Sequence, residues 1–248
     1  MRFFGLEFAE FEALFKKALE KNGLENADEV LCRSFYAFTE HLLKVNAVTN
    51  LTAIRDVPSI ITKHYVDSML LSSYIPQGAR VLDLGCGPGF PSLPLAILRK
   101  DLTIVSLDST AKKVSFVNEC ISLLGFGHIK AIAGRAEDHA LISSLGAFDI
   151  VTSRAVANPL VLCELSLPYL KIGGKMLAMK GAMIEEEANS LKNSKILGIC
   201  GGKEVSFATW NLCSDDLEEQ RGVIVVEKKQ KTDPRYPRAY ATILKKPV

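Results

Sequence analysis

Long runs of uncharged hydrophobic residues are absent from this sequence. Charge, Gly or Pro interrupts each apolar stretch well short of the ~20 residues that a membrane-spanning helix needs, so we expect no transmembrane segment. The N-terminus carries Glu7 and Glu10 and lacks the apolar core of a signal peptide. C-x-x-C pairs are also absent among the six cysteines. Scattered thiols are typical of a reducing compartment rather than of disulfides or zinc sites, so we expect a cytoplasmic protein without a metal.

A strong net charge is missing too, since the formal value is only +2 over 248 residues. The charge is unevenly distributed, because residues 228–248 hold seven basic side chains and one acidic residue, Asp233. A basic tail on an otherwise acidic chain favours a polyanionic partner such as nucleic acid. The alternative is a solvated tail that only aids solubility.

The most informative feature present is a glycine-rich turn between an expected strand and an expected helix. Val81–Leu84 are predicted to form a buried strand, Gly85, Gly87 and Gly89 alternate after it, and a helix follows from Pro91. Such a turn lets the backbone approach a ligand and directs free helix N–H groups toward it. Asp108 ends the next strand, where an acidic side chain suits a ribose diol. The pattern predicts a nucleoside-bearing cofactor at the carboxyl edge of a parallel sheet.

The glycine spacing favours one nucleoside cofactor over another. Dinucleotide enzymes use G-x-G-x-x-G, with the pyrophosphate at the helix N-terminus. Here the spacing is G-x-G-x-G, and Asp83 precedes the first glycine by two residues. A carboxylate at this position would repel a pyrophosphate but could hold the ammonium group of S-adenosyl-L-methionine. We therefore expect a methyl donor, with a nicotinamide oxidoreductase as the alternative, and a turn that binds nothing as a third possibility.

The remaining chain divides into a helical part and an α/β part. Aromatic and aliphatic residues before residue 76 repeat with the 3.6-residue period of helices, which predicts a helical subdomain over 1–76 whose aromatic residues form core. The turn Pro76–Gly78 marks the boundary with a second domain over 77–248. Strands and helices alternate there, which predicts a mainly parallel sheet. The expected strands are Arg80–Leu84, Thr103–Leu107, Ile129–Ala133, Phe148–Thr152, Lys175–Met179 and an antiparallel pair near Gly198–Ala208 and Gly222–Glu227. A helix is expected over Pro159–Leu170.

Other candidate site residues follow the ends of these strands. Ala136 and Glu137 follow the third strand, where they could bracket an adenine or simply begin a helix. Arg154 follows the fourth strand, where its guanidinium could hold a cofactor carboxylate or an RNA phosphate, or form a structural ion pair. Lys180 ends the fifth strand, either as a substrate contact or as a surface lysine. In the helical part, three polar residues are candidate substrate contacts, namely Asn50, His64 and Ser68. The alternative is that His64 is a hydrogen-bonded structural histidine.

Two motifs of base-modifying enzymes are missing after the fourth strand. Enzymes that methylate exocyclic amines usually place an Asn/Asp-Pro-Pro-aromatic run there, whereas this chain reads Thr152-Ser-Arg-Ala-Val156. A cysteine nucleophile for methylation of cytosine carbon is also missing at this position. Guanine N7 requires neither device, because its lone pair is available and no proton must leave. Oxygen, ribose and protein targets also lack these runs, so they remain open.

Taken together, these residues closely resemble the RsmG family, also called glucose-inhibited division protein B, whose members are bacterial 16S ribosomal RNA guanine N(7)-methyltransferases. The resemblance starts near residue 46 and rests on the following segments: Asn50-Leu-Thr-Ala-Ile54, His64 with Asp67-Ser68, Val81–Pro91, Leu93–Leu98, Asp108-Ser109 with Lys112-Lys113, Gly134–Asp138, Phe148–Ala155, Lys180-Gly181, and Tyr236-Pro-Arg238 with Lys245–Pro247. Ser92 and Ala241 stand where the family usually has glycine.

The resemblance implies a seven-stranded class I S-adenosylmethionine-dependent methyltransferase fold, Rossmann-like, with an N-terminal helical extension. The implied acceptor is guanine 527 in the 530 loop of 16S rRNA, presented as naked RNA, as a 30S subunit or as an assembly intermediate. Family cofactor contacts correspond to Gly85, Phe90, Ala136, Glu137 and Arg154.

The full set of expected roles combines the residue patterns with this resemblance. The cofactor-binding residues are Asp83, Gly85, Gly87, Gly89, Phe90, Asp108, Ala136, Glu137 and Arg154, the catalytic ones Arg154 and Lys180, and the substrate-binding ones Asn50, His64, Ser68 and Arg238. We expect a monomer. The alternatives are a non-catalytic RNA-binding or ribosome-assembly protein and a methyltransferase of another substrate.

Overall fold

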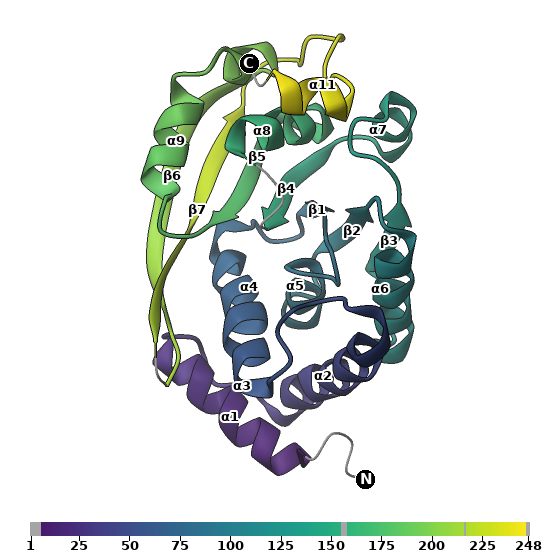
Figure 1. Ribbon diagram of the computed structural model, residues 1–248, viewed down its shortest axis with the longest axis vertical. Coiled ribbons are helices and arrows are strands. Elements are labelled where there is room, and N and C mark those ends of the chain that lie inside the picture. Colours follow the sequence, from purple (N-terminus) through teal and green to yellow (C-terminus); the bar gives the residue numbers. More distant parts are fainter. Residues whose placement is uncertain (1–5, 155–157, 216, 247–248) are drawn as a thin grey trace.

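A computed structural model describes residues 6–154, 158–215 and 217–246. Ala155, Val156 and Pro247, which belong to segments considered above, lie outside the described residues. Within this part of the chain, helices cover both faces of one sheet (Figure 1).

The sheet has seven strands in the order β3-β2-β1-β4-β5-β7-β6. Strands β1 to β5 run parallel, and β7 pairs antiparallel with both β5 and β6. Both the mainly parallel sheet and the antiparallel final pair confirm the prediction. The strands are β1 Arg80–Leu84, β2 Thr103–Asp108, β3 Ile129–Ala133, β4 Phe148–Arg154, β5 Leu170–Lys180, β6 Gly202–Cys213 and β7 Glu218–Lys228.

The N-terminal helices cover one face of this sheet. They are α1 Phe8–Lys21, α2 Glu29–Thr49, α3 Val57–Ile60, the π-helical segment η1 Ile61–Val66, α4 Asp67–Leu70 and the 3₁₀ turn η2 Leu71–Tyr74. The periodic aromatic residues are core, as predicted: Phe35 and Phe38 are fully buried and pack on Tyr65. Phe38 also contacts Phe90 at the glycine turn, so the helices share one hydrophobic core with the sheet. The division of the chain at residue 76 stays a prediction.

Two further helices complete this face, and six elements cover the other. The first group is α5 Ser92–Leu98 and α6 Ala111–Leu124, and the second is α7 His139–Leu145, α8 Pro159–Ser166, the 3₁₀ turn η3 Leu167–Tyr169, α9 Ile184–Lys192, α10 Lys195–Ile199 and α11 Tyr240–Lys245. Alternate residues of each strand point into two separate cores, for example Val81 and Leu82 of β1. In Figure 1, α7, α8 and α11 gather at the end of the molecule opposite α1.

Two expectations about element boundaries are wrong, and one helix was not predicted. The sixth strand begins at Gly202 rather than near residue 198, because α10 occupies the preceding residues and Gly201 turns the chain with φ +83°. The helix expected over 159–170 gives way to a 3₁₀ turn at Leu167, since Pro168 has no N–H for a continuing helix. The tail contains the short helix α11, which the sequence analysis did not predict.

The described helices include none that is both long enough and apolar enough for a membrane span.

Candidate active site

A cleft of about 460 Å³ lies at the carboxyl edge of the parallel strands. Its volume falls within the range of small-molecule sites. One side, here called the glycine end, consists of the loops after β1, β2 and β3, namely Gly85–Pro88 with Phe90, Asp108–Thr110 and Gly134–Glu137. The other side, the arginine end, consists of Leu51, Thr52, His64 and Arg154.

The glycine turn needs its glycines for backbone reasons. Gly85, Gly87 and Gly89 have φ values of +73°, +56° and +92°, which side-chain-bearing residues rarely adopt. A Cβ at Gly89 would lie 2.7 Å from Cγ of Leu93, so this glycine permits close packing of the turn on α5. A Cβ at Gly87 would meet no protein atom within 4 Å, and Gly87 lines the cleft. Gly87 therefore leaves room for a ligand.

Asp108 connects the loop after β2 to the glycine turn. Its Oδ2 accepts a hydrogen bond from Gly87 N at 2.9 Å, and its Oδ1 accepts one from Thr110 N at 2.8 Å. The side chain is largely buried but lines the cleft. Each carboxylate oxygen keeps a further lone pair, so the group can still accept hydrogen bonds from two hydroxyl groups.

The loop after β3 closes the glycine end. Ala136 and Glu137 both line the cleft, as their predicted role requires. The carbonyl of Ala136 accepts a hydrogen bond from the Tyr169 hydroxyl at 3.0 Å, and Glu137 pairs with Arg135 at 2.8 Å. These contacts fix the loop before any ligand binds.

Arg154 and His64 meet at the arginine end. Nη1 of Arg154 donates to the Lys63 carbonyl at 2.8 Å and lies 3.7 Å from Oδ2 of Asp67, while Nη2 contacts Nδ1 of His64 at 3.1 Å. The π-helical segment η1 places His64 in this position, and its ring stacks on Phe90 with centroids 4.3 Å apart. The guanidinium carbon of Arg154 lies 4.9 Å from the same Phe90 ring centroid. The side chains of Arg154 and His64 are thus held by one network of hydrogen bonds and ring contacts.

Burial controls the protonation of this network. It lowers the pKa of His64 to about 3, with the positive charge of Arg154 as a second cause. His64 is therefore neutral near neutral pH. Burial also lowers the pKa of Arg154 and raises that of Asp67.

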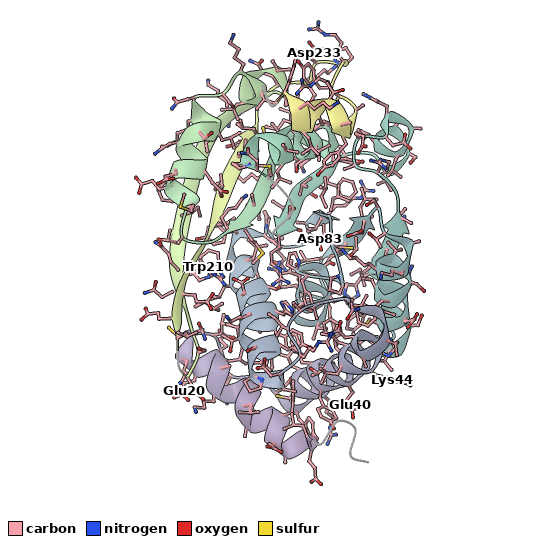
Figure 2. All side chains as sticks on the ribbon, in the orientation of Figure 1. Glu20, Glu40, Lys44, Asp83, Trp210 and Asp233 are labelled. Carbon is pink, nitrogen blue, oxygen red and sulfur yellow. The ribbon has the colours of Figure 1, made fainter. Side chains whose placement is uncertain are left out.

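Asp83 lies beneath the cleft rather than in its lining. Figure 2 shows it in the middle of the molecule, and its side chain is fully buried. Its carboxylate accepts hydrogen bonds from Ser92 N at 3.1 Å and from the Thr152 hydroxyl at 3.2 Å. Burial raises its pKa to about 6. Asp83 supports the start of α5, and direct contact with a cofactor ammonium stays a prediction.

Five other predicted site residues also lie outside the cleft lining. Gly89 faces Leu93, and the Ser68 hydroxyl is buried and donates to the His64 carbonyl at 2.6 Å. Asn50 ends α2 in a left-handed conformation and accepts a hydrogen bond from Arg55. The last two form ion pairs that hold elements of the fold together, Lys180 with Glu187 and Arg238 with Glu164. Their predicted roles stay predictions.

Several residues of the cleft lining were not predicted from the sequence. Thr52 lies two residues from the predicted Asn50 and faces the cleft in its place. Tyr240 reaches the lining from α11 in the basic tail, and Lys113 reaches it from α6. The Asn50-Leu-Thr52 segment was a usable signal for Thr52, whereas nothing local marks Tyr240. Over the described ranges, no group of three or more His, Cys, Asp or Glu side chains could hold a metal ion.

Comparison with known proteins gives matches along most of the chain. The profile of the family GidB, rRNA small subunit methyltransferase G, matches residues 31–211. A ribosomal RNA small subunit methyltransferase G from Clostridium perfringens (strain 13 / Type A) is 38% identical, covering 95% of this chain and 98% of its own. Its namesake from Lactococcus lactis is 35% identical over 94% and 98%. A solved O-methyltransferase from Bacillus cereus in complex with SAH has a TM-score of 0.54 at 17% identity, covering 90% of this chain and all of that one.

The sheet order and the reversed last strand define a class I methyltransferase fold, and the expected fold class with its N-terminal helical extension is confirmed. The family profile covers well over half of the residues, and the curated relatives match almost end to end. The chain belongs to the rRNA small subunit methyltransferase G family, which confirms the resemblance to RsmG.

Proposed function

We propose that this protein transfers the methyl group of S-adenosylmethionine to N7 of guanine 527 in the 530 loop of 16S rRNA. The observation that carries the proposal is the composition of the cleft. A buried carboxylate, Asp108, and an open glycine backbone at Gly87 form one end, and the cation Arg154 lies at the other. Family membership supports rRNA as the substrate class.

The residues of the glycine end fit the proposed cofactor. Asp108 has lone pairs for two ribose hydroxyls, Gly87 leaves space above the backbone, and Ala136 and Glu137 border a site for the adenine. Arg154 has five N–H donors, of which hydrogen bonds to Lys63 and His64 use two, and the Asp67 carboxylate lies 3.7 Å away, so donors remain for a carboxylate or a phosphate. When bound, S-adenosylmethionine would supply the methyl group on its sulfonium, and transfer of that methyl group to the guanine N7 lone pair would leave S-adenosylhomocysteine.

The chain has little proton chemistry to perform in this reaction. N7 carries no proton, so no general base is required, and neutral His64 serves as a fixed acceptor for the Arg154 guanidinium. The site must hold the two reactants in line and exclude water. In well-aligned systems, such positioning lowers the activation barrier by roughly 7–11 kcal/mol. Arg154 is held by three protein contacts, so it offers a positioned cation. Lys180, the last residue of β5, is a second candidate cation.

Several wider expectations are part of this proposal. The natural substrate would be naked 16S rRNA, a 30S subunit or an assembly intermediate, bound in the cytoplasm by a monomer. The basic tail would contribute to RNA binding through residues such as Arg238, although its guanidinium is paired with buried Glu164. Asn50, His64 and Ser68 would position the RNA, either directly or through neighbouring groups.

Mass spectrometry of 16S rRNA fragments tests the proposal. RNA from a strain lacking this protein, and the same RNA treated with protein and donor, should differ by one methyl group on guanine 527 at N7. Normal methylation in the deletion strain would favour a non-catalytic assembly role. A methyl group at another atom or nucleotide would refute the proposed acceptor while leaving the donor site intact.

A further inference from the structure

Thr52 is held in the cleft by an amide clamp. The Asn46 side chain donates from Nδ2 to the Thr52 carbonyl at 3.0 Å and accepts from Thr52 N through Oδ1 at 2.9 Å. Asn46 is itself buried in α2. The loop between α2 and α3 therefore presents Thr52 to the cleft in a fixed position, beside His64.

The hydrogen-bond partners of His64 determine its tautomer. Arg154 can only donate, so Nδ1 of His64 must accept from Nη2 and carries no proton. In the neutral ring the proton is then on Nε2, which contacts Oγ1 of Thr52 at 3.0 Å. Nε2–H therefore donates to the Thr52 oxygen.

Among the described residues, the hydroxyl proton of Thr52 has no hydrogen-bond acceptor. Oγ1 also accepts from Ile54 N at 3.2 Å, so both of its lone pairs are used. Across the residues that the structure describes, Oγ1 makes no hydrogen bond beyond these two, and neither partner accepts its proton, since Ile54 N and His64 Nε2 are both donors. Thr52 lines the cleft, so its O–H is a donor available to a ligand.

We propose that the Thr52 hydroxyl donates a hydrogen bond to O6 of the target guanine and thereby selects guanine over adenine. The inference rests on the proposed function. Guanine presents two acceptors on this edge, N7 and O6. A donor on N7 would occupy the lone pair that must attack the methyl group, so a single hydroxyl donor is suited to O6. Adenine presents an amino group in place of O6. The Thr52 hydroxyl and this amino group would then face each other as two donors.

The contact contributes to recognition rather than to the chemical step. As N7 forms its bond to the methyl carbon, the purine gains positive charge and O6 becomes a weaker acceptor. Loss of the Thr52 hydroxyl should therefore raise KM more than it lowers kcat. Thr52 acts on the substrate, whereas His64 acts through Thr52 and is a positioning residue.

The test pairs variants of Thr52 with a substrate that lacks O6. Wild type, Thr52→Val and Thr52→Ser are compared on RNA carrying guanine or 2-aminopurine at the target position, which keeps N7 but has no O6. We expect Thr52→Val to lower kcat/KM on guanine RNA about tenfold, the loss of one hydrogen bond, and to change it less than about twofold on 2-aminopurine RNA. Thr52→Ser, which keeps the hydroxyl, should recover the preference for guanine.

Equilibrium binding of both RNAs in the presence of S-adenosylhomocysteine gives a second readout and should show the same selective loss. Equal losses on both RNAs would overturn the proposal, because they would indicate a disturbed fold rather than a lost contact. Full activity of Thr52→Val on guanine RNA would also overturn it, while leaving the proposed function intact. A wild-type protein that does not methylate guanine N7 would refute the proposed function itself, and the Thr52 contact with it.

Discussion

The two ends of the cleft are built in different ways. The glycine end consists mainly of backbone and of loops that directly follow β1, β2 and β3, with Asp108 as its anchoring side chain. The arginine end consists of side chains from three distant positions, Thr52, His64 and Arg154, joined in one hydrogen-bond network. The glycine end is thus adapted to a ligand with a constant shape, and the arginine end to one that must be distinguished by its polar groups.

The largest effect is expected at the glycine end, from Asp108→Ala. It removes the carboxylate proposed to accept two ribose hydroxyls, so affinity for S-adenosylhomocysteine should fall about a hundredfold by calorimetry. Asp138→Ala is a matched control, because Asp138 also accepts from two backbone N–H groups but lies outside the cleft lining. Unchanged affinity in Asp108→Ala would remove the ribose assignment.

Arg154→Lys should show that the two ends of the cleft have different roles. A lysine ammonium cannot reproduce the planar fork that reaches both Lys63 and His64, so kcat/KM should fall roughly tenfold to a hundredfold. Donor affinity should change less than in Asp108→Ala. Arg80→Lys is the control, since Arg80 also donates from both terminal guanidinium nitrogens to protein acceptors, here two carbonyl groups at the opposite end of the sheet. If donor affinity fell as far as in Asp108→Ala, Arg154 would belong with the glycine end.

The network at the arginine end should also appear in the pH dependence of stability. His64 has its pKa lowered from 6.5 to about 3, so between these values the unfolded chain binds a proton that the folded chain does not. Its contribution to stability is complete above pH 6.5 and is lost as the pH falls toward 3. From pH ~7 to pH ~4.5, wild type should lose about 2 kcal/mol more than His64→Gln in urea unfolding. Parallel profiles would show that Nδ1 is not locked as an acceptor.

The smallest effect is expected at the glycine turn itself. Gly87→Ala places a methyl group where the protein leaves space, so donor affinity should fall about tenfold with a stability loss of only about 1 kcal/mol. Gly173→Ala also places a methyl group on a positive-φ glycine with no neighbouring atoms, outside the cleft lining, and should leave affinity unchanged. Equal affinity in both variants would mean that the ligand does not approach Gly87.

The same contrast explains how far the sequence could be interpreted. The strand–turn–helix pattern and Asp108 are local, since short spacings place them at adjacent strand ends, so the fold and most of the glycine end were predictable. To predict Thr52 as a cleft residue, one must know which loop borders the cleft. Spacing alone does not show whether the Asp83 side chain faces the ligand or is buried beneath the cleft. Arg238 was expected in an RNA-binding tail, but its ion pair with buried Glu164 depends on how the tail folds back. Side-chain networks between distant segments are fixed by tertiary packing, which one sequence does not display.

The central claim is that one cleft holds the methyl donor with its ribose at Asp108 and its reactive sulfur toward the arginine end. A crystal structure with S-adenosylhomocysteine tests this most directly. The account predicts ligand density along the loops after β1, β2 and β3, with both ribose hydroxyls on the Asp108 carboxylate and the sulfur on the side of Thr52 and Arg154. An empty cleft, or a ligand bound elsewhere on the molecule, would contradict it.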